Sequence, residues 1–400
     1  MNRQAFIIDA LRSPFGRYGG ALASVRPDDL ASQVINALMK RNPQIDPSLI
    51  DDVILGCANQ SGEDNRNIAR MSSLLAGLPV TVPGSTVNRL CGSGLMAVNM
   101  ACQSILANEG DIFIAGGVES MSRAPFVMAK SDEAFKRGDN ILYDTTIGWR
   151  FINPKLAQMY YPYTMGETAE NVAQKYNISR SDQDEFALVS QQKYAMAKSN
   201  NRFSNEIMPL TVTKIKQSFV VDHDEHPRMD CKIEDLTRLK PAFKENGTVT
   251  AGNSSGINDG ACVLLVVSAD VVAKYNLKPL AKFVASSVAG VDPSIMGIGP
   301  VSATQKCLKK ADLKISDINV IELNEAFAAQ SLACIQELKL NPKIVNVNGG
   351  AIAVGHPLGA SGARILSTLI YEMVRNDYNY GLATMCIGVG QGIATVISKV

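Results

Sequence analysis

The sequence predicts an α/β protein made of two similar halves. Three strand-and-loop pairs recur in the same order, roughly 260 to 270 residues apart, and such internal repetition indicates duplicated structural units. Short apolar runs alternate with longer helical stretches, which is typical of parallel sheets covered by helices on both faces. Hydrophobic residues make up 46% of the 400 residues, so the chain can bury a large core.

The expected strands are short apolar runs that end in polar or glycine-containing loops. The first half begins near residues 5–8 and the second near 280–284. The repeated strands are expected at 51–56, 86–88 and 111–117 in the first half, and at 318–323, 345–347 and 381–386 in the second. We assign residues 1–120 to an N-terminal half, 121–250 to an inserted loop region, 251–270 to the return into the first half, and 271–400 to a C-terminal half.

The segment from about residue 119 to 251 breaks the repeated pattern. Methionines, aromatic residues and charges are frequent in it, and a long insertion of this kind can wrap the entrance to an active site. Within it, residues 181–184 predict the start of an amphipathic helix with a polar cap.

Charge and composition exclude several classes of protein. Lys and Arg number 39 against 38 Asp and Glu, a net charge of +1 that provides no general field for nucleic acid or an anionic membrane. The longest apolar run, residues 261–267, is far too short to span a bilayer, and the N-terminus lacks the pattern of a signal peptide. None of the eight cysteines forms a CxxC pair, so zinc-ribbon and thioredoxin chemistry have no support. We therefore expect a cytoplasmic protein without nucleic-acid or membrane partners.

Cys91 stands between a predicted strand and the start of a predicted helix. Gly92 and Gly94 allow a tight turn and the close approach of a ligand. The unpaired N–H groups and partial positive charge of a helix N-terminus favour a thiolate at this place. An inert, buried cysteine beside turn glycines explains the same residues, and both interpretations stay open at this point.

Of the three histidines, His356 is the strongest candidate for chemistry. It lies in a glycine-rich loop at a predicted strand-to-helix junction, where backbone can approach a substrate. His223 and His226 lie in a charged stretch, which is more typical of a solvated loop than of a metal site. We expect no bound metal.

Cys386 lies near the end of the last strand pair and is followed by three glycines in five residues. No lysine follows as in a phosphate-binding loop, so a second thiol that exchanges a proton with a ligand is the alternative. The four candidates Cys91, Asn324, His356 and Cys386 each fall just beyond the C-terminal end of a predicted strand. Open α/β sheets bind ligands at that edge.

Several motifs resemble those of the thiolase family over essentially the whole length. They are VNRLCGSG at 87–94, GGVESMS at 116–122, NEAF at 324–327, GHPLGASG at 355–362 and CIGVGQG at 386–392. The resemblance implies the thiolase fold, in which two duplicated βαβαβαββ halves form a layered α-β-α-β-α sandwich with an inserted loop domain. It also implies an acyltransferase. Residues 52–60, 62–67 and 144–151 look like the branch that cleaves 3-oxoadipyl-CoA with CoA to succinyl-CoA and acetyl-CoA, in the degradation of aromatic compounds.

The same resemblance assigns roles to the candidate residues. Cys91 matches the nucleophile that carries the acyl group, His356 the base, and Cys386 the acid/base thiol. An imidazole and a thiol that titrate near neutrality suit these tasks. Asn324 matches the residue that holds an oxyanion-binding water, and Gly388, with Cys91, the backbone oxyanion donors.

Coenzyme A enters as a co-substrate, and the resemblance implies no permanently bound cofactor. Four residues match CoA-contacting positions of the family: Met165, Arg228, Ser255 and Phe327. Two positions depart from some biosynthetic thiolases, since Thr164 replaces a histidine and Asp235 a neutral polar residue. The family forms dimers or tetramers, so we expect a homodimer or a homotetramer.

The substrate of the 3-oxoadipyl branch ends in a carboxylate, which is costly to bury without a cation or several donors. Arg66 and Arg150 lie in the stretches that resemble this branch, and we hypothesise that at least one binds the carboxylate; a purely structural role for both is the alternative. Three other functions stay open: an acetyl-CoA C-acetyltransferase or general 3-oxoacyl-CoA thiolase, a ketoacyl-synthase type of condensing enzyme, which Cys386 argues against, and an inactive CoA- or lipid-binding protein.

Overall fold

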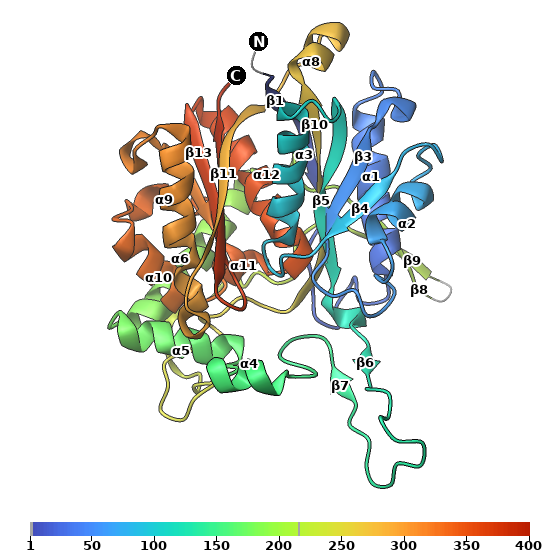
Figure 1. The fold of residues 1–400 in the computed structure, drawn as a ribbon. Helices are drawn as coiled ribbons and strands as arrows, with labels where there is room; N and C mark the ends of the chain where they lie inside the picture. Colours follow the sequence, from blue (N-terminus) through green and yellow to red (C-terminus); the bar gives the residue numbers. More distant parts are fainter. Residues whose placement is uncertain (1–2, 215–216) are drawn as a thin grey trace.

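The computed structural model describes residues 3–214 and 217–400. Within these residues, ten strands form one continuous sheet in the order β12-β13-β14-β11-β1-β10-β5-β3-β4, with β2 added beside β10. The two halves join where Phe6 and Ile7 of β1 pair with β11. Figure 1 shows the blue and cyan elements of the first half beside the orange and red elements of the second.

The first half has the predicted order of elements. It runs β1 (Ala5–Arg12), β2 (Gly16–Arg17), α1 (Pro27–Arg41), β3 (Asp52–Gly56), α2 (Ile68–Leu75), β4 (Gly84–Val87), α3 (Ser93–Leu106), β5 (Ile112–Ser120) and, after the insertion, β10 (Asn258–Ser268) and α8 (Ala269–Tyr275). Apart from the short β2 and the trailing α8, this is the βαβαβαββ order that the thiolase resemblance implies.

The second half repeats this order with one difference. It runs β11 (Ala281–Gly290), α9 (Gly299–Ala311), β12 (Val320–Leu323), α10 (Ala328–Glu337), α11 (Ala351–Val354), α12 (Leu358–Asn376), β13 (Tyr380–Ile387) and β14 (Gln391–Ser398). The strand predicted at 345–347 is reduced to a bridge between Ile321 and Val345. Asn346 explains the reduction, because its φ is 47° and its side-chain amide bonds to the backbone of Leu323 in place of a ladder.

The sheet is mixed, so the expectation of parallel sheets is wrong in part. Only β3–β4, β3–β5 and β12–β13 pair in parallel within the described residues. The last two strands of each half run antiparallel, as β5–β10 and β13–β14. The apolar pattern could not reveal this direction, because a strand buried on both faces has the same near-continuous apolar run in either orientation.

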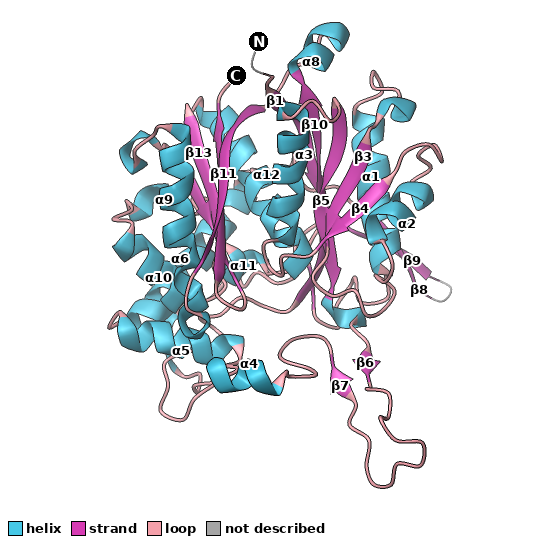
Figure 2. Cartoon of the chain, in the orientation of Figure 1, coloured by secondary structure: helices cyan, strands magenta, loops and turns pink. Residues whose placement is uncertain are grey.

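The helices form layers around the sheet, as Figure 2 shows. Helix α1 buries Leu30, Val34 and Leu38 against the outer face of the first half. Helices α3 and α12 pack on each other between the two halves. Helix α9 covers the outer face of the second half with Ala303 and Cys307. This arrangement matches the implied α-β-α-β-α sandwich, in which every sheet face is buried.

The insertion lies at one end of the sheets and contains β6 (Phe126–Val127), β7 (Tyr143–Asp144), α4 (Pro154–Met159), α5 (Met165–Lys175), α6 (Arg180–Ser199), β8 (Leu210–Lys214), β9 (Gln217–Val221) and α7 (Ile233–Thr237). The chain between β6 and β7 projects from the body in Figure 1. The capped helix predicted at 181–184 is α6, whose capping box is formed by Ser179 and Asp182. Five 3₁₀ turns connect elements of the described chain: η1 (Pro47–Leu49), η2 (Met121–Arg123), η3 (Pro293–Ile298), η4 (Ile315–Asp317) and η5 (Pro342–Ile344).

A buried ion network ties the insertion to β1. Arg12 is fully buried and binds Glu206 at 2.8 Å and Asp224 at 2.6 and 2.9 Å. Tyr194 of α6 donates to the same Asp224. A buried cation is tolerated only when it is paired and hydrogen-bonded in this way, so loss of one partner would release the insertion from the sheet.

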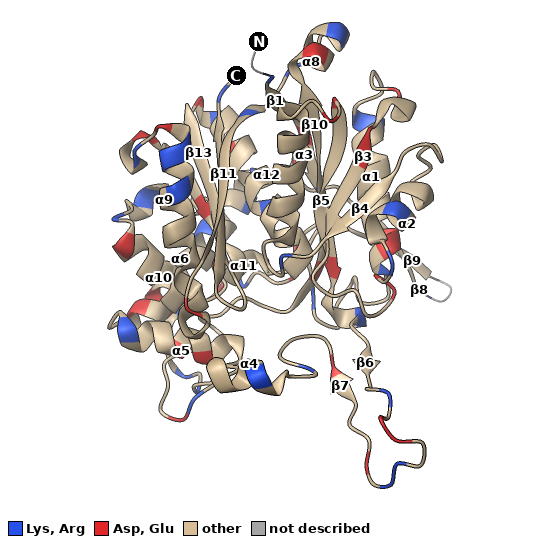
Figure 3. Cartoon of the chain, in the orientation of Figure 1, with Lys and Arg blue, Asp and Glu red and all other residues tan. Residues whose placement is uncertain are grey.

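Charges of both signs are interspersed over the elements in view in Figure 3, in keeping with the net charge of +1. In the described part of the chain, no helix combines the length and the apolar character that crossing a bilayer requires.

Candidate active site

Cys91 lies in the loop between β4 and α3 and lines a cavity of about 240 Å³. The loop is held by Ser93, whose hydroxyl donates to Leu90 O at 2.6 Å and accepts from Arg89 N at 2.9 Å. Leu90 has a φ of 47°, an unusual conformation for a non-glycine residue that often marks a functional turn. The apolar part of the cavity wall consists of Leu90, Met121, Ile147, Trp149, Met165, Leu358 and Val389.

The thiol of Cys91 is protonated in the free protein. Burial raises the pKa of this thiol to about 11, although the backbone N–H groups of Gly388 and of Cys91 itself lower it. The backbone N–H groups favour the thiolate, as expected at a helix N-terminus, but desolvation outweighs them. Cys91 needs a base to become a nucleophile.

Cys386 lies beside Cys91, from the other half of the fold. A Cβ on Gly92 would be 2.7 Å from the side chain of Ile387, so the Cys91 loop is in direct contact with the end of β13. Burial raises the pKa of Cys386 well above its ordinary value, and the neighbouring Cys91 raises it further. Cys386 is the second-to-last residue of β13 rather than a loop residue. The expectation of a thiol tuned only slightly from neutrality is wrong for the same reason of burial.

A tight turn after Cys386 directs Gly388 toward Cys91. Val389 and Gly390 have φ values of 61° and 77°, and a Cβ on Gly388 would lie 3.5 Å from the sulfur of Met165. The backbone of Gly388 therefore lines the cavity, where a side chain would occupy ligand space.

His356 lies in the loop between α11 and α12, not directly after a strand. Its N–H donates to Asn258 Oδ1 at 3.0 Å, and its Nδ1 lies 2.6 Å from Ser361 Oγ. Burial lowers the pKa of the imidazole to about 3, with a smaller contribution from the positive charge of Arg364. The expectation of titration near neutrality is thus wrong for the free protein, in which the imidazole of His356 is neutral.

Close glycine contacts place the His356 loop against the Cys91 loop. A Cβ on Gly94 would lie 2.5 Å from the carbonyl oxygen of Gly359, and one on Gly117 would lie 2.0 Å from the same atom. Leu358, two residues after His356, lines the cavity together with Cys91. The starts of α3 and α12 meet at this cavity because glycine allows backbone to touch backbone.

Asn324 follows β12 and is joined to β13 by a bond from its N–H to Thr384 O at 3.0 Å. Its side chain is fully buried, yet neither amide atom has a hydrogen-bond partner in the described structure. The same holds for Nε2 of His356. Unpaired buried polar atoms are costly and uncommon, so these three atoms fit a substrate oxygen or an ordered water.

Glu119, which the sequence interpretation did not select, is also in the cavity wall. It accepts hydrogen bonds from the N–H groups of Ala58, Asn59 and Gly359 at 2.8 to 3.0 Å. Burial raises the pKa of Glu119 to about 7. A single acid within the apolar run of β5 is the signal that could have identified it, since an acid is rarely buried without partners. Because its carboxylate oxygens accept from these backbone N–H groups, Glu119 holds the loop at Ala58 and Asn59 against the start of α12 at Gly359.

Of the four predicted CoA-contacting residues, only Met165 lines the cavity. Met165 begins α5 and packs with Phe327 and Cys386 in one apolar cluster. Ser255 is half-buried and bonds through its N–H to Ala326 O. Arg228 is exposed and does not line the cavity.

The two departures from the family pattern have local structural partners. Thr164 caps α5 in a capping box with Glu167. Asp235 accepts from Lys232 N at 3.0 Å and pairs with Arg238 at 3.0 Å.

The two arginines considered for binding the substrate carboxylate differ in their positions relative to the cavity. Arg150 is half-buried and lines the cavity with Cys91. Arg66 is exposed, has a φ of 66°, and does not line the cavity. The neighbouring Trp149 donates from Nε1 to Tyr163 O at 2.9 Å and holds this part of the wall. Of the two arginines, only Arg150 is placed to meet a ligand on Cys91.

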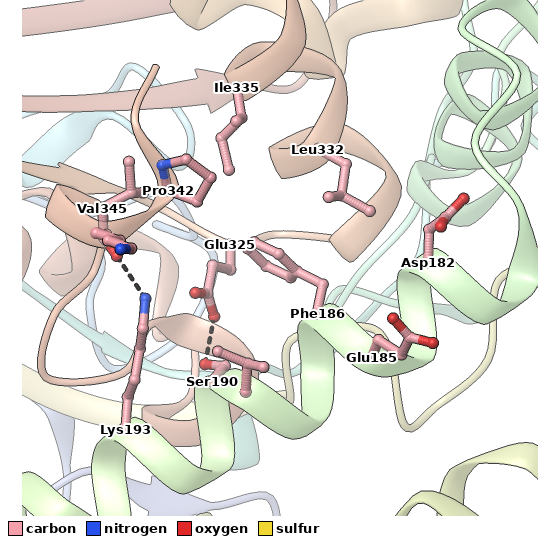
Figure 4. Close-up of a pocket in the computed structure, with 12 residues that line it drawn as sticks. Asp182, Glu185, Phe186, Ser190, Lys193, Glu325, Leu332, Ile335, Pro342 and Val345 are labelled. Carbon is pink, nitrogen blue, oxygen red and sulfur yellow. Dashed lines mark hydrogen bonds between the residues drawn. The ribbon is translucent and has the colours of Figure 1, made fainter. Parts of the chain in front are cut away.

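A second cavity, of about 440 Å³, lies between α6 and α10, and neither Cys91 nor Cys386 lines it. Figure 4 shows Glu325 at its floor, where the carboxylate accepts from Ser190 Oγ at 2.7 Å, and Lys193, which donates to Val345 O at 2.8 Å. Glu325 also accepts from Asn346. These bonds attach the loop that carries Asn324 to the insertion.

His223 and His226 do not approach the cavity. His223 is exposed and lies 2.6 Å from Asp222. Burial lowers the pKa of His226 to about 4. The one cluster of metal-ligand type in the described chain consists of Cys57, Asp64 and Glu119.

Comparisons with known proteins cover the whole chain. A family model described as "Thiolase, N-terminal domain" matches residues 5–270, and one described as "Thiolase, C-terminal domain" matches 277–399. Over 100% of both chains, the sequence is 56% identical to a beta-ketoadipyl-CoA thiolase of Acinetobacter baylyi and 56% identical to the 3-oxoadipyl-CoA/3-oxo-5,6-dehydrosuberyl-CoA thiolase of Escherichia coli. The structure of human mitochondrial 3-ketoacyl-CoA thiolase in complex with CoA superimposes with a TM-score of 0.93 at 42% identity, covering 100% of this chain and 98% of that one.

Proposed function

This chain belongs to the thiolase family of acyltransferases, and on that premise we propose that it cleaves 3-oxoadipyl-CoA with CoA to succinyl-CoA and acetyl-CoA. The observation that carries this proposal is the cavity that joins Cys91 to Arg150. One wall holds the thiol that attacks the keto carbon, and another holds a cation for the distal carboxylate. Full-length relatives named for the same substrate support the proposal.

The first step forms an acyl-enzyme. His356 Nε2, which is unprotonated and buried, takes the proton of Cys91, and the sulfur attacks C3 of the substrate. A neutral base is needed here because the pKa of Cys91 is raised to about 11 by burial. The C2–C3 bond then breaks, leaving a succinyl group on Cys91 and the enolate of acetyl-CoA.

Cys386 protonates the enolate carbon. Its pKa, raised well above the ordinary value by burial, keeps the thiol protonated until the carbanion forms. The contact between the Cys91 loop and the end of β13 supports this role, because it brings the two thiols close together. The resulting acetyl-CoA departs, and the thiolate left on Cys386 takes the proton that His356 removed from Cys91.

The second step transfers the succinyl group to CoA. With its first proton passed to Cys386, His356 takes the proton of the incoming CoA thiol, and the CoA thiolate attacks the acyl-enzyme. Cys91 leaves as a thiolate and takes that proton back from His356. The apolar cluster of Met165 and Phe327 is suited to the pantetheine arm, while Ser255 and the exposed Arg228 extend the path toward solvent and suit the rest of CoA.

Negative charge on oxygen develops at two places in these steps. One oxyanion is suited to His356 Nε2, once this atom carries the proton of Cys91, and to a water bound to the Asn324 amide. The backbone N–H groups of Cys91 and Gly388, which already lower the pKa of the Cys91 thiol, suit the other. Donors fixed in advance cost no reorganisation when the charge forms.

A direct thiolysis assay tests the substrate. The protein is mixed with free CoA and either 3-oxoadipyl-CoA or acetoacetyl-CoA, and loss of each 3-oxoacyl-CoA is followed. We expect a higher kcat/KM for 3-oxoadipyl-CoA, because only that substrate offers a carboxylate to Arg150. A preference for acetoacetyl-CoA or for longer unsubstituted chains would instead indicate an acetyl-CoA C-acetyltransferase or a general 3-oxoacyl-CoA thiolase. No turnover of either would indicate a binding protein.

We further propose that Arg150, and not Arg66, binds the distal carboxylate. Arg150 is the cationic residue among those that line the Cys91 cavity, and no ion pair within the described residues occupies its guanidinium. A planar guanidinium can bind a carboxylate with two hydrogen bonds. Three carbon–carbon bonds separate C3 from the carboxylate carbon, so the partner must lie in the same small cavity as Cys91.

Replacing Arg150 with methionine is expected to lower kcat/KM for 3-oxoadipyl-CoA by about 10- to 100-fold, which corresponds to the loss of one hydrogen bond between charged groups. The value for acetoacetyl-CoA should stay unchanged. Arg66→Met is the matched control and should leave the ratio of the two substrates as it is. An equal loss for both substrates with Arg150→Met would show that Arg150 holds CoA instead, and unchanged kcat/KM values for both substrates would show that Arg150 has no role in binding.

We propose that the protein is a homodimer or a homotetramer that acts in aromatic-compound degradation. Exposed apolar side chains on the projecting chain between β6 and β7 support self-association; they include Phe126, Phe135, Ile141 and Leu142, each more than 60% exposed. A location in the cytoplasm stays a prediction.

A further inference from the structure

The hydrogen bonds of His356 restrict where its ring proton can lie. Nδ1 is 2.6 Å from the hydroxyl oxygen of Ser361, and both atoms are buried. The same hydroxyl is 2.8 Å from the carbonyl oxygen of Pro357, which can only accept. Because a serine hydroxyl has a single hydrogen, a bond to Pro357 leaves Ser361 Oγ as an acceptor for Nδ1–H.

The opposite nitrogen has no partner. Nε2 of His356 is buried and makes no hydrogen bond in the described structure. With the proton on Nδ1, Nε2 presents a lone pair, as a base requires. With the proton on Nε2, the Nε2–H group would be buried without an acceptor. Nε2 would then have no lone pair to accept the proton of Cys91.

The geometry around Ser361 is fixed on several sides. Ser361 is fully buried in the first turn of α12, and its N–H donates to Pro357 O at 2.9 Å. Glu119 holds Gly359 at 2.8 Å, and Asn258 holds the backbone of His356 at 3.0 Å. The hydroxyl therefore meets Nδ1 without needing to move, which is what a preorganised site requires.

We propose that Ser361 is a positioning residue that holds His356 as the Nδ1-protonated tautomer, so that Nε2 is free to take protons from Cys91 and from the CoA thiol. The role of this tautomer in turnover rests on the proposed function. The assignment of the tautomer does not rest on the proposed function, because the tautomer is a property of the free protein.

Nitrogen NMR of protein labelled with ¹⁵N-histidine measures the tautomer directly. The chain has three histidines, so the spectrum is simple, and His356 is identified by its loss in His356→Gln. We expect the Nε2 resonance of His356 in the unprotonated range and that of Nδ1 in the protonated range. A protonated Nε2 in the wild-type protein would overturn the proposal, whatever the protein cleaves.

Kinetics of Ser361→Ala measure the consequence. Loss of the hydroxyl should lower kcat by about 10- to 100-fold with KM nearly unchanged, a smaller loss than the ~10²–10⁴ expected from removing a general base. The assay uses whichever 3-oxoacyl-CoA the wild type cleaves, so failure of the substrate assignment does not affect it. Acylation of Cys91 by that substrate in a single turnover should slow by the same factor.

Ser367→Ala is the matched control. Ser367 lies on the same helix, is equally buried, and its hydroxyl has no partner in the described structure. It should keep the wild-type kcat and tautomer. A kcat of Ser361→Ala equal to that of Ser367→Ala would overturn the proposal, and if Ser361→Ala does not fold, the wild-type spectrum still decides it.

Discussion

Replacing Cys91 with alanine is expected to lower thiolysis by roughly 10⁴- to 10⁶-fold, the scale seen when a covalent nucleophile is removed. The reason is that Cys91 is the one thiol among the described residues that line the cavity, whereas Cys386 lies in a strand. Steady-state loss of 3-oxoadipyl-CoA measures the rate. Mass spectrometry of the wild-type protein, mixed with substrate and no free CoA, should show a succinyl group on Cys91 and none in the variant.

Cys102→Ala is the control for this experiment. Cys102 is fully buried in α3, the helix that follows Cys91, and belongs to the apolar core. This variant should keep wild-type turnover with some loss of stability, since it removes a small buried group. Substantial turnover of Cys91→Ala, or a succinyl group on another residue, would contradict the assignment of the nucleophile.

Replacing Cys386 with alanine is expected to separate two reactions that share Cys91. Carbon–carbon cleavage should fall by about 10²- to 10⁴-fold, because the enolate loses its proton donor. Exchange of labelled CoA into acetyl-CoA should persist at a much higher fraction of the wild-type rate, since transfer of an acetyl group between thiols forms no carbanion. The two rates are measured on the same preparation.

Cys334→Ala serves as the matched variant here. Cys334 is a buried cysteine near enough to Cys386 that a charge on it would raise the pKa of Cys386. Its own thiol donates to Gly297 O in the core of the second half. Both rates should stay near those of the wild type. If Cys386→Ala lowered cleavage and exchange by equal factors, Cys386 would only support packing around Cys91.

Much of the fold follows from local patterns in the chain. The repeated order of apolar runs and helices predicted two related halves, and β1 and β11 begin where the runs at 5–8 and 280–284 begin. The direction of the strands did not follow, because a run buried on both faces fits either direction. The third strand of the second half was wrong for a different reason: Asn346 adopts a left-handed conformation and bonds to Leu323 instead of joining a ladder.

For the candidate site, the motifs predicted which residues to consider but not their electrostatics. Cys91 was expected to favour the thiolate, and His356 and Cys386 to titrate near neutrality, whereas burial raises the pKa of both thiols and lowers that of the imidazole. Glu119 and Ser361 were passed over because their partners are distant in sequence or lie in a turn that the sequence does not specify. The choice between Arg150 and Arg66 likewise needed the cavity.

Short-range periodicity and motifs are enough to predict the two-half α/β architecture and the residue types at the site. The mixed sheet, the burial that leaves Cys91 and His356 uncharged, and the cavity that Arg150 lines depend instead on long-range packing. The physical reason is that protonation and access depend on how much water and which charges surround a group, and these neighbours come from segments hundreds of residues apart.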